Sequence, residues 1–216
     1  MLLPGDPGRA LALAQELLAA PRMFNHNRGL WGYTGAALAD GEPLTIQSTG
    51  MGGPSAAIVL EELIVLGAQR AIRVGTAGAL DAALELGDLL VVERAICADG
   101  TSRALGAGAL AGADPGLTAA LAAAAPAAAS GTVVSSDLFY EVGEPRFEQW
   151  RARGARAVEM EAAALFAIGA LRGVAVGCVL AITDQLAGPS ERERISAAAL
   201  HEAGVAVGRA GAGALR

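Results

Sequence analysis

Apolar segments and short polar breaks alternate along the whole chain, and this alternation predicts strands and helices in turn. Short runs rich in valine, isoleucine and leucine, bounded by glycine, proline or charged residues, are typical of strands inside a sheet. They occur at 44–49, 71–75, 88–96, 132–136 and 174–184. Longer apolar segments predict helices at 10–18, 55–66, 115–125 and 161–171, and from 196 onward, and the more polar segment 146–153 is also expected to be helical. Polar or glycine-rich stretches predict loops at 25–34, 101–116 and 186–193.

This order of elements predicts an α/β fold: a single-domain, three-layer α/β/α sandwich around a mixed central β-sheet. The long apolar run at 174–184 is expected in the centre of the sheet. We expect the strand that starts at Ala71 to break at Gly75, and the segment AVEM, 157–160, to lead into the helix at 161–171. The pattern shows no internal repeat, so one domain is expected over residues 1–216.

Composition and charge narrow the class of function. The chain is 53% hydrophobic and carries a net charge of −6 without a basic block, so nucleic-acid binding through a basic face is not expected. All 16 basic residues are arginine, which excludes a lysine Schiff base and a P-loop lysine. Cys97 and Cys178 lack metal-ligand spacing and are expected as reduced, buried thiols of a cytoplasmic protein. No segment has the length of a membrane span, and the start is too short in its apolar part for a signal peptide.

Arginines near predicted strand ends and in loops are candidates for binding an anion. Arg9 lies in a Gly/Pro loop that opens a helix, where backbone N–H groups and a guanidinium together favour an anion. Arg73 lies inside an apolar strand, and the hydroxyl of Thr76 follows it. Arg28 lies in a predicted loop. Arginines suit a phosphate, although each could instead form a structural salt bridge with an acid.

Two further features concern the ligand. The segment GMGGPS, 50–55, follows a strand and precedes a helix, which is weakly similar to a dinucleotide-binding turn. The next strand has no acid for a ribose at its end, so this reading is not favoured. Glu159 and Glu161 lie in an otherwise apolar segment, and buried carboxylates need a partner. That partner could be a cation of the protein, a metal, or the hydroxyls of a ligand.

Taken in order along the chain, several motifs resemble the hexameric class of nucleoside phosphorylases, which includes bacterial purine nucleoside phosphorylase and uridine phosphorylase. These motifs are LPGDPGRA, NRGLWGYTG, STGMGGPSAAIVLEELIVLGA, IRVGTAGAL, GDLLVV, SSDLFY, VEMEAAALF and VLAITD. The resemblance covers nearly the whole chain, and NRGLWGYTG and DLFY make it stronger for the purine enzyme. It implies a phosphorylase/hydrolase-like fold and reversible phosphorolysis of (deoxy)ribonucleosides to a free base and (deoxy)ribose 1-phosphate. It implies no metal and no organic cofactor, with inorganic phosphate as co-substrate.

The resemblance also implies the site residues, motif by motif. Phosphate is expected at Gly5, Arg9, Arg73 and Thr76, with Arg28 reaching in from a neighbouring subunit of a homohexamer built as a trimer of dimers. Ribose is expected at Met160 and Glu161, and the base at Ala77, Gly78, Phe139, Tyr140, Val158 and Glu159. Asp184 falls at the position of the purine enzymes' general acid, and either Arg192 or Arg194 is expected to assist it. An ionised Glu161 that accepts two hydrogen bonds from a vicinal diol would explain one of the two acids.

The sequence also departs from the family pattern. The family's N-terminal histidine for the 5′-hydroxyl has no counterpart before Gly5, and His26 is not an obvious replacement, so either the start is truncated or 5′ recognition is weaker. The segment 141–156 is shorter than the uracil-binding insert of uridine enzymes, which favours a purine substrate. A uridine or broad-specificity phosphorylase is the main alternative. A nucleosidase would not need three arginines, and a non-catalytic nucleoside-binding relative remains a further alternative.

Overall fold

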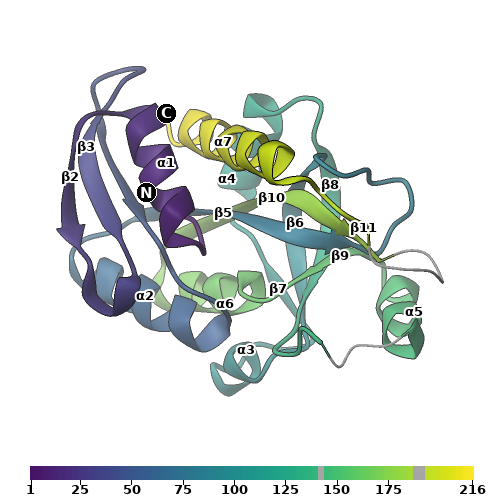
Figure 1. Ribbon diagram of the computed structural model, residues 1–216. Coiled ribbons are helices and arrows are strands. Elements are labelled where there is room, and N and C mark those ends of the chain that lie inside the picture. Colours follow the sequence, from purple (N-terminus) through teal and green to yellow (C-terminus); the bar gives the residue numbers. More distant parts are fainter. Residues whose placement is uncertain (141–143, 187–192) are drawn as a thin grey trace.

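The computed structural model describes residues 1–140, 144–186 and 193–216, which form one layered α/β structure (Figure 1). The strands are β1 (Leu2–Leu3), β2 (Leu18–Asn25), β3 (Gly32–Ala37), β4 (Pro43–Gln47), β5 (Arg70–Ala79), β6 (Leu89–Cys97), β7 (Leu110–Gly112), β8 (Ala129–Ser135), β9 (Ala155–Glu159), β10 (Ala175–Gln185) and β11 (Glu193–Arg194). The helices are α1 (Pro7–Leu17), α2 (Gly53–Val65), α3 (Gly100–Ala104), α4 (Pro115–Ala124), α5 (Glu144–Ala152), α6 (Ala162–Arg172) and α7 (Ala197–Ala214), with a 3-10 turn at Asn27–Gly29.

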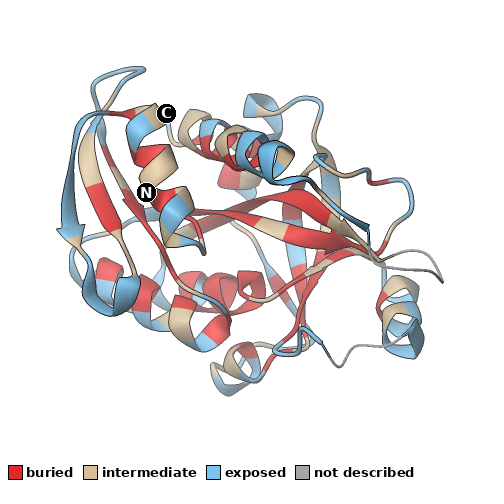
Figure 2. Cartoon of the chain, viewed as in Figure 1, coloured by how far each residue is buried: buried red, intermediate tan, exposed pale blue. Residues whose placement is uncertain are grey.

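The predicted three-layer α/β/α sandwich is confirmed. Helices α1, α4 and α7 pack on one face of the sheet, while α2, α3 and α6 pack on the other (Figure 1). The buried residues are concentrated in the sheet between the two helix layers and on the helix faces that pack against it (Figure 2). Strand β10 is buried over most of its length between parallel β5 and antiparallel β6, as its continuous apolar run predicts.

The sheet forks at β5. One edge of β5 pairs with β10 along its length, whereas the other pairs with β1 at Ile72 and Arg73 and with β9 at Gly78 and Ala79. Strands β5, β10, β6, β8 and β9 therefore join in a closed ring, and β1, β4, β3 and β2 extend from it as an open sheet. Between Arg73 and Gly78 none of the described strands pairs with this second edge, so β1 and β9 diverge there.

Local sequence signals explain where two of the helices begin. Asp6 accepts a hydrogen bond from the Arg9 backbone N–H at 2.7 Å, and Pro7 occupies the first turn of α1. Asp114 caps α4 in the same way through Leu117 N–H, at 2.8 Å. These caps fix where each helix begins and therefore which residues face the sheet.

Some predicted elements were wrong. Strand β5 does not break at Gly75 but continues to Ala79, because pairing with β10 supports it on both sides of the glycine. The predicted loop at 101–116 contains α3 and β7, and the loop at 25–34 includes the end of β2 and the start of β3. Residues 155–159 form β9 rather than the approach to a helix. These short strands are defined by neighbouring strands, which local sequence does not reveal.

Candidate functional site

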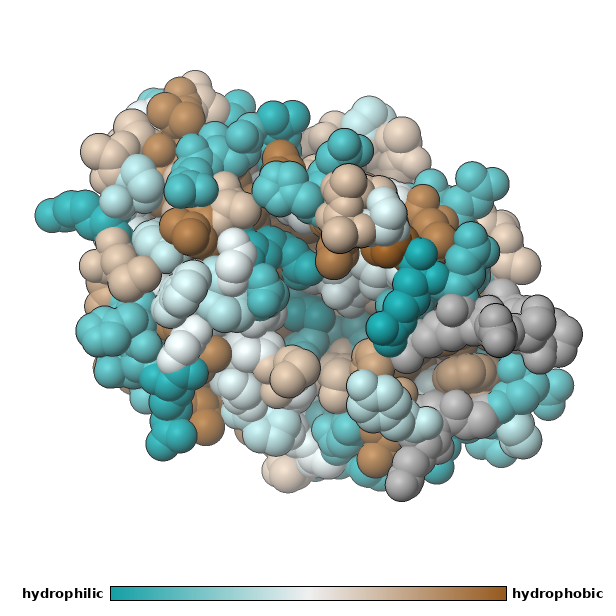
Figure 3. Space-filling view, in the orientation of Figure 1, coloured by the Kyte–Doolittle hydropathy of each residue, from teal (hydrophilic) through white to brown (hydrophobic). Residues whose placement is uncertain are grey.

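The fork in β5 collects the ends of several elements at one place. Gly5 follows parallel β1, and Gly50 and Gly52 follow parallel β4. Strand β9 runs antiparallel to β5, so its last residue, Glu159, points back toward the fork. The space-filling view shows a recess near the middle of this face with hydrophilic residues at its base (Figure 3).

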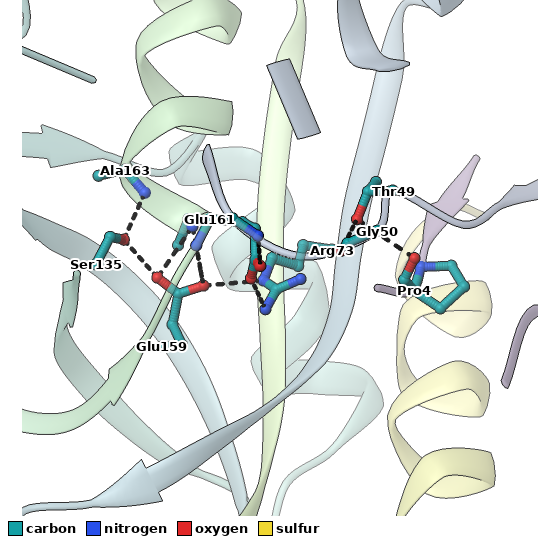
Figure 4. A network of polar contacts seen from close by, with 10 residues as sticks. Pro4, Thr49, Gly50, Arg73, Ser135, Glu159, Glu161 and Ala163 are labelled. Atoms are coloured by element: carbon teal, nitrogen blue, oxygen red, sulfur yellow. Dashed lines mark hydrogen bonds and ion pairs between the residues drawn. The ribbon is translucent and has the colours of Figure 1, made fainter. Parts of the chain in front are cut away.

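Arg73 lies at the centre of the fork and pairs with both acids of the sequence motif (Figure 4). Its Nε atom is 3.0 Å from an oxygen of Glu159, and its Nη2 atom contacts Glu161. The three side chains are at most 6% exposed. Burial opposes the charge on Arg73, but Glu161 and Glu159 outweigh it and raise the pKa of the guanidinium above its ordinary value. The open question about the partner of the two acids thus has an answer within the chain: it is a protein cation.

The third nitrogen of the Arg73 guanidinium, Nη1, is buried and has no hydrogen-bond partner among the described residues. It faces the loop after β1, since a Cβ built on Gly5 would lie 3.9 Å from it. Arg9 lies in the first turn of α1, just after this loop. Burial lowers the pKa of the Arg9 guanidinium, and the positive charge of nearby Arg73 lowers it further. A buried cation with an unused donor, next to a second arginine, is suited to an oxyanion.

Glu161 is placed to bind a ligand beside this anion site. One of its oxygens accepts a hydrogen bond from the Gly52 N–H and the other contacts Arg73. A carboxylate can accept about four hydrogen bonds, so acceptor capacity remains for hydroxyl groups. The glycine-rich turn at 50–53, which weakly resembled a dinucleotide site, instead donates its backbone N–H to this acid.

Glu159, which was predicted beside the base, is enclosed by groups of the protein. Its side chain is 0% exposed, and it accepts hydrogen bonds from Ser135, from Arg73 and from the N–H groups of Glu161 and Ala162. Burial raises the pKa of the Glu159 carboxyl group, and Arg73 opposes that rise. Its contacts are those of a group enclosed by protein. Sequence reasoning missed Ser135, whose only signal was a serine at the end of an apolar strand.

Asp184 lies near the end of β10, opposite Gly78 of β5. Its carboxylate is 3.0 Å from the Arg194 Nε atom across the β10–β11 pair, and it accepts a hydrogen bond from Thr183 Oγ1 at 2.9 Å. The Asp184 side chain is 15% exposed, so its surroundings remain partly open to solvent. Arg194 is therefore in position to assist Asp184, whereas Arg192 lies outside the described residues.

The remaining residues predicted to bind base, ribose or phosphate differ in how far they are buried. Ala77 and Gly78 are buried on β5, and a Cβ on Gly78 would lie 2.6 Å from Leu186, which covers it. Thr76, Val158 and Met160 are half-buried. The rings of Phe139 and Tyr140 pack edge to face with their centroids 4.9 Å apart, and Tyr140 is 87% exposed. Their assignments to base, ribose and phosphate stay predictions.

Arg28 does not join the other arginines within the chain. It is exposed in the turn between β2 and β3 and has a left-handed backbone, with φ of 56°. A non-glycine residue in this region is uncommon and is often held there for a function. Its predicted contribution to a neighbouring subunit stays a prediction.

A second hollow, of about 310 Å³, lies at the far ends of α1 and α7. Its two arginines are each paired with an acid, Arg209 with Glu16 and Arg216 with Asp40. Arg73 also pairs with acids, but it keeps a buried Nη1 donor that has no partner among the described residues, so the fork is the better anion site despite the volume of the hollow. Among the described residues, no three histidine, cysteine, aspartate or glutamate side chains gather as metal ligands, and no helix could span a membrane. The prediction that no cofactor is used stays a prediction.

Comparison with known proteins identifies what this arrangement resembles. Residues 1–212 match the family model described as the phosphorylase superfamily. A DeoD-type purine nucleoside phosphorylase of Clostridium perfringens is 37% identical over 197 residues, covering 86% of this chain and 81% of the relative. A uridine phosphorylase of Treponema pallidum is 38% identical over 198 residues, covering 84% and 76%. A DeoD-type purine nucleoside phosphorylase of Exiguobacterium is 34% identical over 198 residues, covering 86% and 81%.

Proposed function

Because this chain belongs to the phosphorylase superfamily and is an enzyme of the pentosyltransferase type, we propose that it is a purine nucleoside phosphorylase. It would convert a purine (deoxy)ribonucleoside and inorganic phosphate into a free base and (deoxy)ribose 1-phosphate. The observation that carries this proposal is the Arg73 guanidinium, which is held by Glu159 and Glu161 while its buried Nη1 atom lacks a partner. This places an oxyanion donor beside a carboxylate suited to a sugar diol.

The reaction follows from this arrangement. Phosphate would bind between Arg73, the loop at Gly5 and Arg9 in the first turn of α1, where the two arginines offset its charge. Glu161 accepts hydrogen bonds from the ribose 2′ and 3′ hydroxyls and so orients the anomeric carbon toward the phosphate. As the glycosidic bond breaks, the sugar gains oxocarbenium character, which the nearby phosphate anion stabilises before its oxygen bonds to that carbon.

The departing base takes the electron pair of the glycosidic bond and needs a proton. Asp184, paired with Arg194, is placed to supply one to N7 of a purine. Phe139 and Tyr140 provide an aromatic surface of the kind that packs against a base. A phosphorylase with this acid favours purines, because a purine has a basic nitrogen in its five-membered ring.

Uridine phosphorolysis is the second candidate, since a relative named uridine phosphorylase is as similar to this chain as the purine enzymes are. A broad substrate range would be consistent with both relatives.

The experiment is to measure base release from inosine, adenosine and uridine, each with and without inorganic phosphate. We expect release from the purine nucleosides only with phosphate, with ribose 1-phosphate as the second product. Release from uridine alone would favour the second candidate. Release without phosphate would mean hydrolysis, and binding of nucleoside without turnover would mean a non-catalytic relative.

A further inference from the structure

Glu159 is the most enclosed acid of the site, and the reaction described above gives it no contact with a substrate. Its side chain is fully buried, and its carboxylate accepts from Arg73 Nε at 3.0 Å, Glu161 N–H at 2.8 Å and Ala162 N–H at 2.9 Å, as well as from Ser135 Oγ. These four donors match the acceptor capacity of a carboxylate. Nothing remains with which Glu159 could bind a base, and its role must therefore lie in the groups that it holds.

The first of these groups is the Arg73 guanidinium, which is planar and rigid. Glu159 holds its Nε side and Glu161 its Nη2 side, so the direction of Nη1 is fixed by two contacts rather than one. Gly75 permits this position, because a Cβ there would lie 2.8 Å from the Arg73 Cζ atom. The free Nη1 donor is thereby directed toward Gly5.

The second group is the beginning of α6. The same Glu159 carboxylate binds the N–H groups of Glu161 and Ala162, while the Ser135 hydroxyl bridges from Glu159 to the Ala163 N–H at 2.9 Å (Figure 4). Glu161 immediately precedes α6. Glu159 therefore fixes both the arginine that faces the phosphate and the backbone that carries the ribose-binding acid.

We propose that Glu159, supported by Ser135, is a positioning residue that orients Arg73 Nη1 for phosphate. This proposal rests on the proposed function, deepens it, and replaces the base-binding role that the sequence predicted for Glu159. Glu159 acts through Arg73 and does not touch phosphate, nucleoside or the reacting atoms.

The test is the Glu159→Gln variant, titrated with inorganic phosphate by calorimetry and assayed with a purine nucleoside. Glutamine keeps the size but replaces one acceptor oxygen with an NH2 donor and removes the charge that holds Arg73. We expect the Kd for phosphate and the phosphate KM to rise by about tenfold or more, because charge-assisted hydrogen bonds hold the guanidinium. The KM for the nucleoside should rise by a smaller factor, because Glu159 reaches the ribose only through the Glu161 backbone, and the preference among bases should stay the same.

Two further variants keep the result interpretable. Ser135→Ala removes one hydrogen bond to Glu159 and should raise the phosphate Kd in the same direction but less, and it serves if Glu159→Gln does not fold. Asp114→Ala removes a carboxylate that caps α4 in the same backbone-binding manner, away from the fork. It should lower the melting temperature without changing the phosphate Kd.

The outcomes separate the possibilities. An unchanged phosphate Kd with a changed preference among bases would return Glu159 to the base site. A loss of melting temperature with unchanged phosphate Kd would make Glu159 structural only. If the wild-type protein binds phosphate but catalyses no phosphorolysis, the proposed function fails while the titration still tests the positioning of Arg73. If the wild-type protein binds no phosphate, the positioning role is wrong.

Discussion

At the residue scale, one guanidinium pairs with two carboxylates in the interior of the protein. Arg73 is at most 5% exposed and pairs with Glu159 and Glu161, so the buried group carries one positive and two negative charges. Desolvating each ion costs several kcal/mol, and removing one partner of a buried pair typically costs about 3–5 kcal/mol. Such a cluster is an expensive way to stabilise a fold. Its value lies in presenting a fixed donor and a fixed acceptor to a substrate.

Asp184 is the residue on which substrate preference should depend. The Asp184→Asn variant should lower kcat for adenosine about 10²-fold, because general acid catalysis of this kind contributes about 10²–10⁴. The measurement is steady-state phosphorolysis of adenosine and inosine.

The matched control for Asp184 is a substrate that does not need a proton. With 7-methylguanosine, whose base is already cationic, the same variant should retain most of its rate. The Arg194→Ala variant should reproduce the loss with adenosine to a smaller degree, because Arg194 is 59% exposed. A full rate of Asp184→Asn with adenosine would remove Asp184 from the role of acid.

At the element scale, the close approach of α7 to the sheet defines one side of the site. Gly211 packs where a Cβ would lie 2.8 Å from Val74 and 2.9 Å from Leu2, and Gly204 lies against the Arg9 side chain. Small residues at these positions let the helix lie near β5 and β1. The position of Arg9 thus depends on the distance between a helix and a sheet that are far apart in sequence.

Gly211 should be intolerant of a side chain although alanine favours helices. Gly211→Ala gains about 1 kcal/mol of helix propensity but overpacks a core of Leu2, Ile72 and Val74, which costs about 1–3 kcal/mol. We expect a net loss of about 1 kcal/mol and a melting temperature lower by a few degrees. Thermal unfolding is the measurement.

Gly213→Ala provides the comparison within the same helix. Its Cβ would meet only Ala124, which is exposed, at 3.2 Å, so stability should stay the same or rise. Equal stability of the two variants would show that packing around Gly211 does not limit the approach of α7.

At the scale of the whole molecule, the forked sheet divides the chain into a ring and an extended sheet, and the site lies where they separate. Both ends of the chain meet at the start of β5, where the Met1 amino group donates to Arg70 O and the Arg70 side chain donates to Leu215 O. The β2–β3 hairpin forms the outer edge of that sheet and carries exposed Arg28, Met23 and Phe24. An exposed arginine and apolar side chains on an outer edge are suited to contact with a second copy of the chain.

If Arg28 completes the phosphate site of a neighbouring subunit, two inactive variants should restore one another. Arg28→Ala and Arg73→Ala should each lose at least about 10²-fold in kcat/KM. Subunits mixed after dissociation should regain activity, since a mixed pair contains one site with neither change.

The control for this mixing experiment is each variant mixed with itself under the same conditions. Sedimentation should show an oligomer for the wild-type protein and for both variants. A monomer with full activity, or no recovery on mixing, would exclude Arg28 from a shared site.

Sequence by itself determined the layers of the fold, and it singled out Arg73, Glu159 and Glu161, which the structure brings into contact. Apolar periodicity is local, and it therefore located the long elements such as α2 and β10. Motif order located the acids and arginines, because their spacing along the chain is what the family resemblance rests on.

Only the tertiary structure decided which of those groups meet. The fork in β5 cannot be read locally, because β1 and β9 pair with it from positions about 70 and 80 residues away. The two acids looked equivalent in sequence, yet packing encloses Glu159 against Ser135 and α6 while Glu161 meets Gly52. The physical reason is that hydrophobic pattern reports burial, whereas the partner of a buried charge depends on long-range packing.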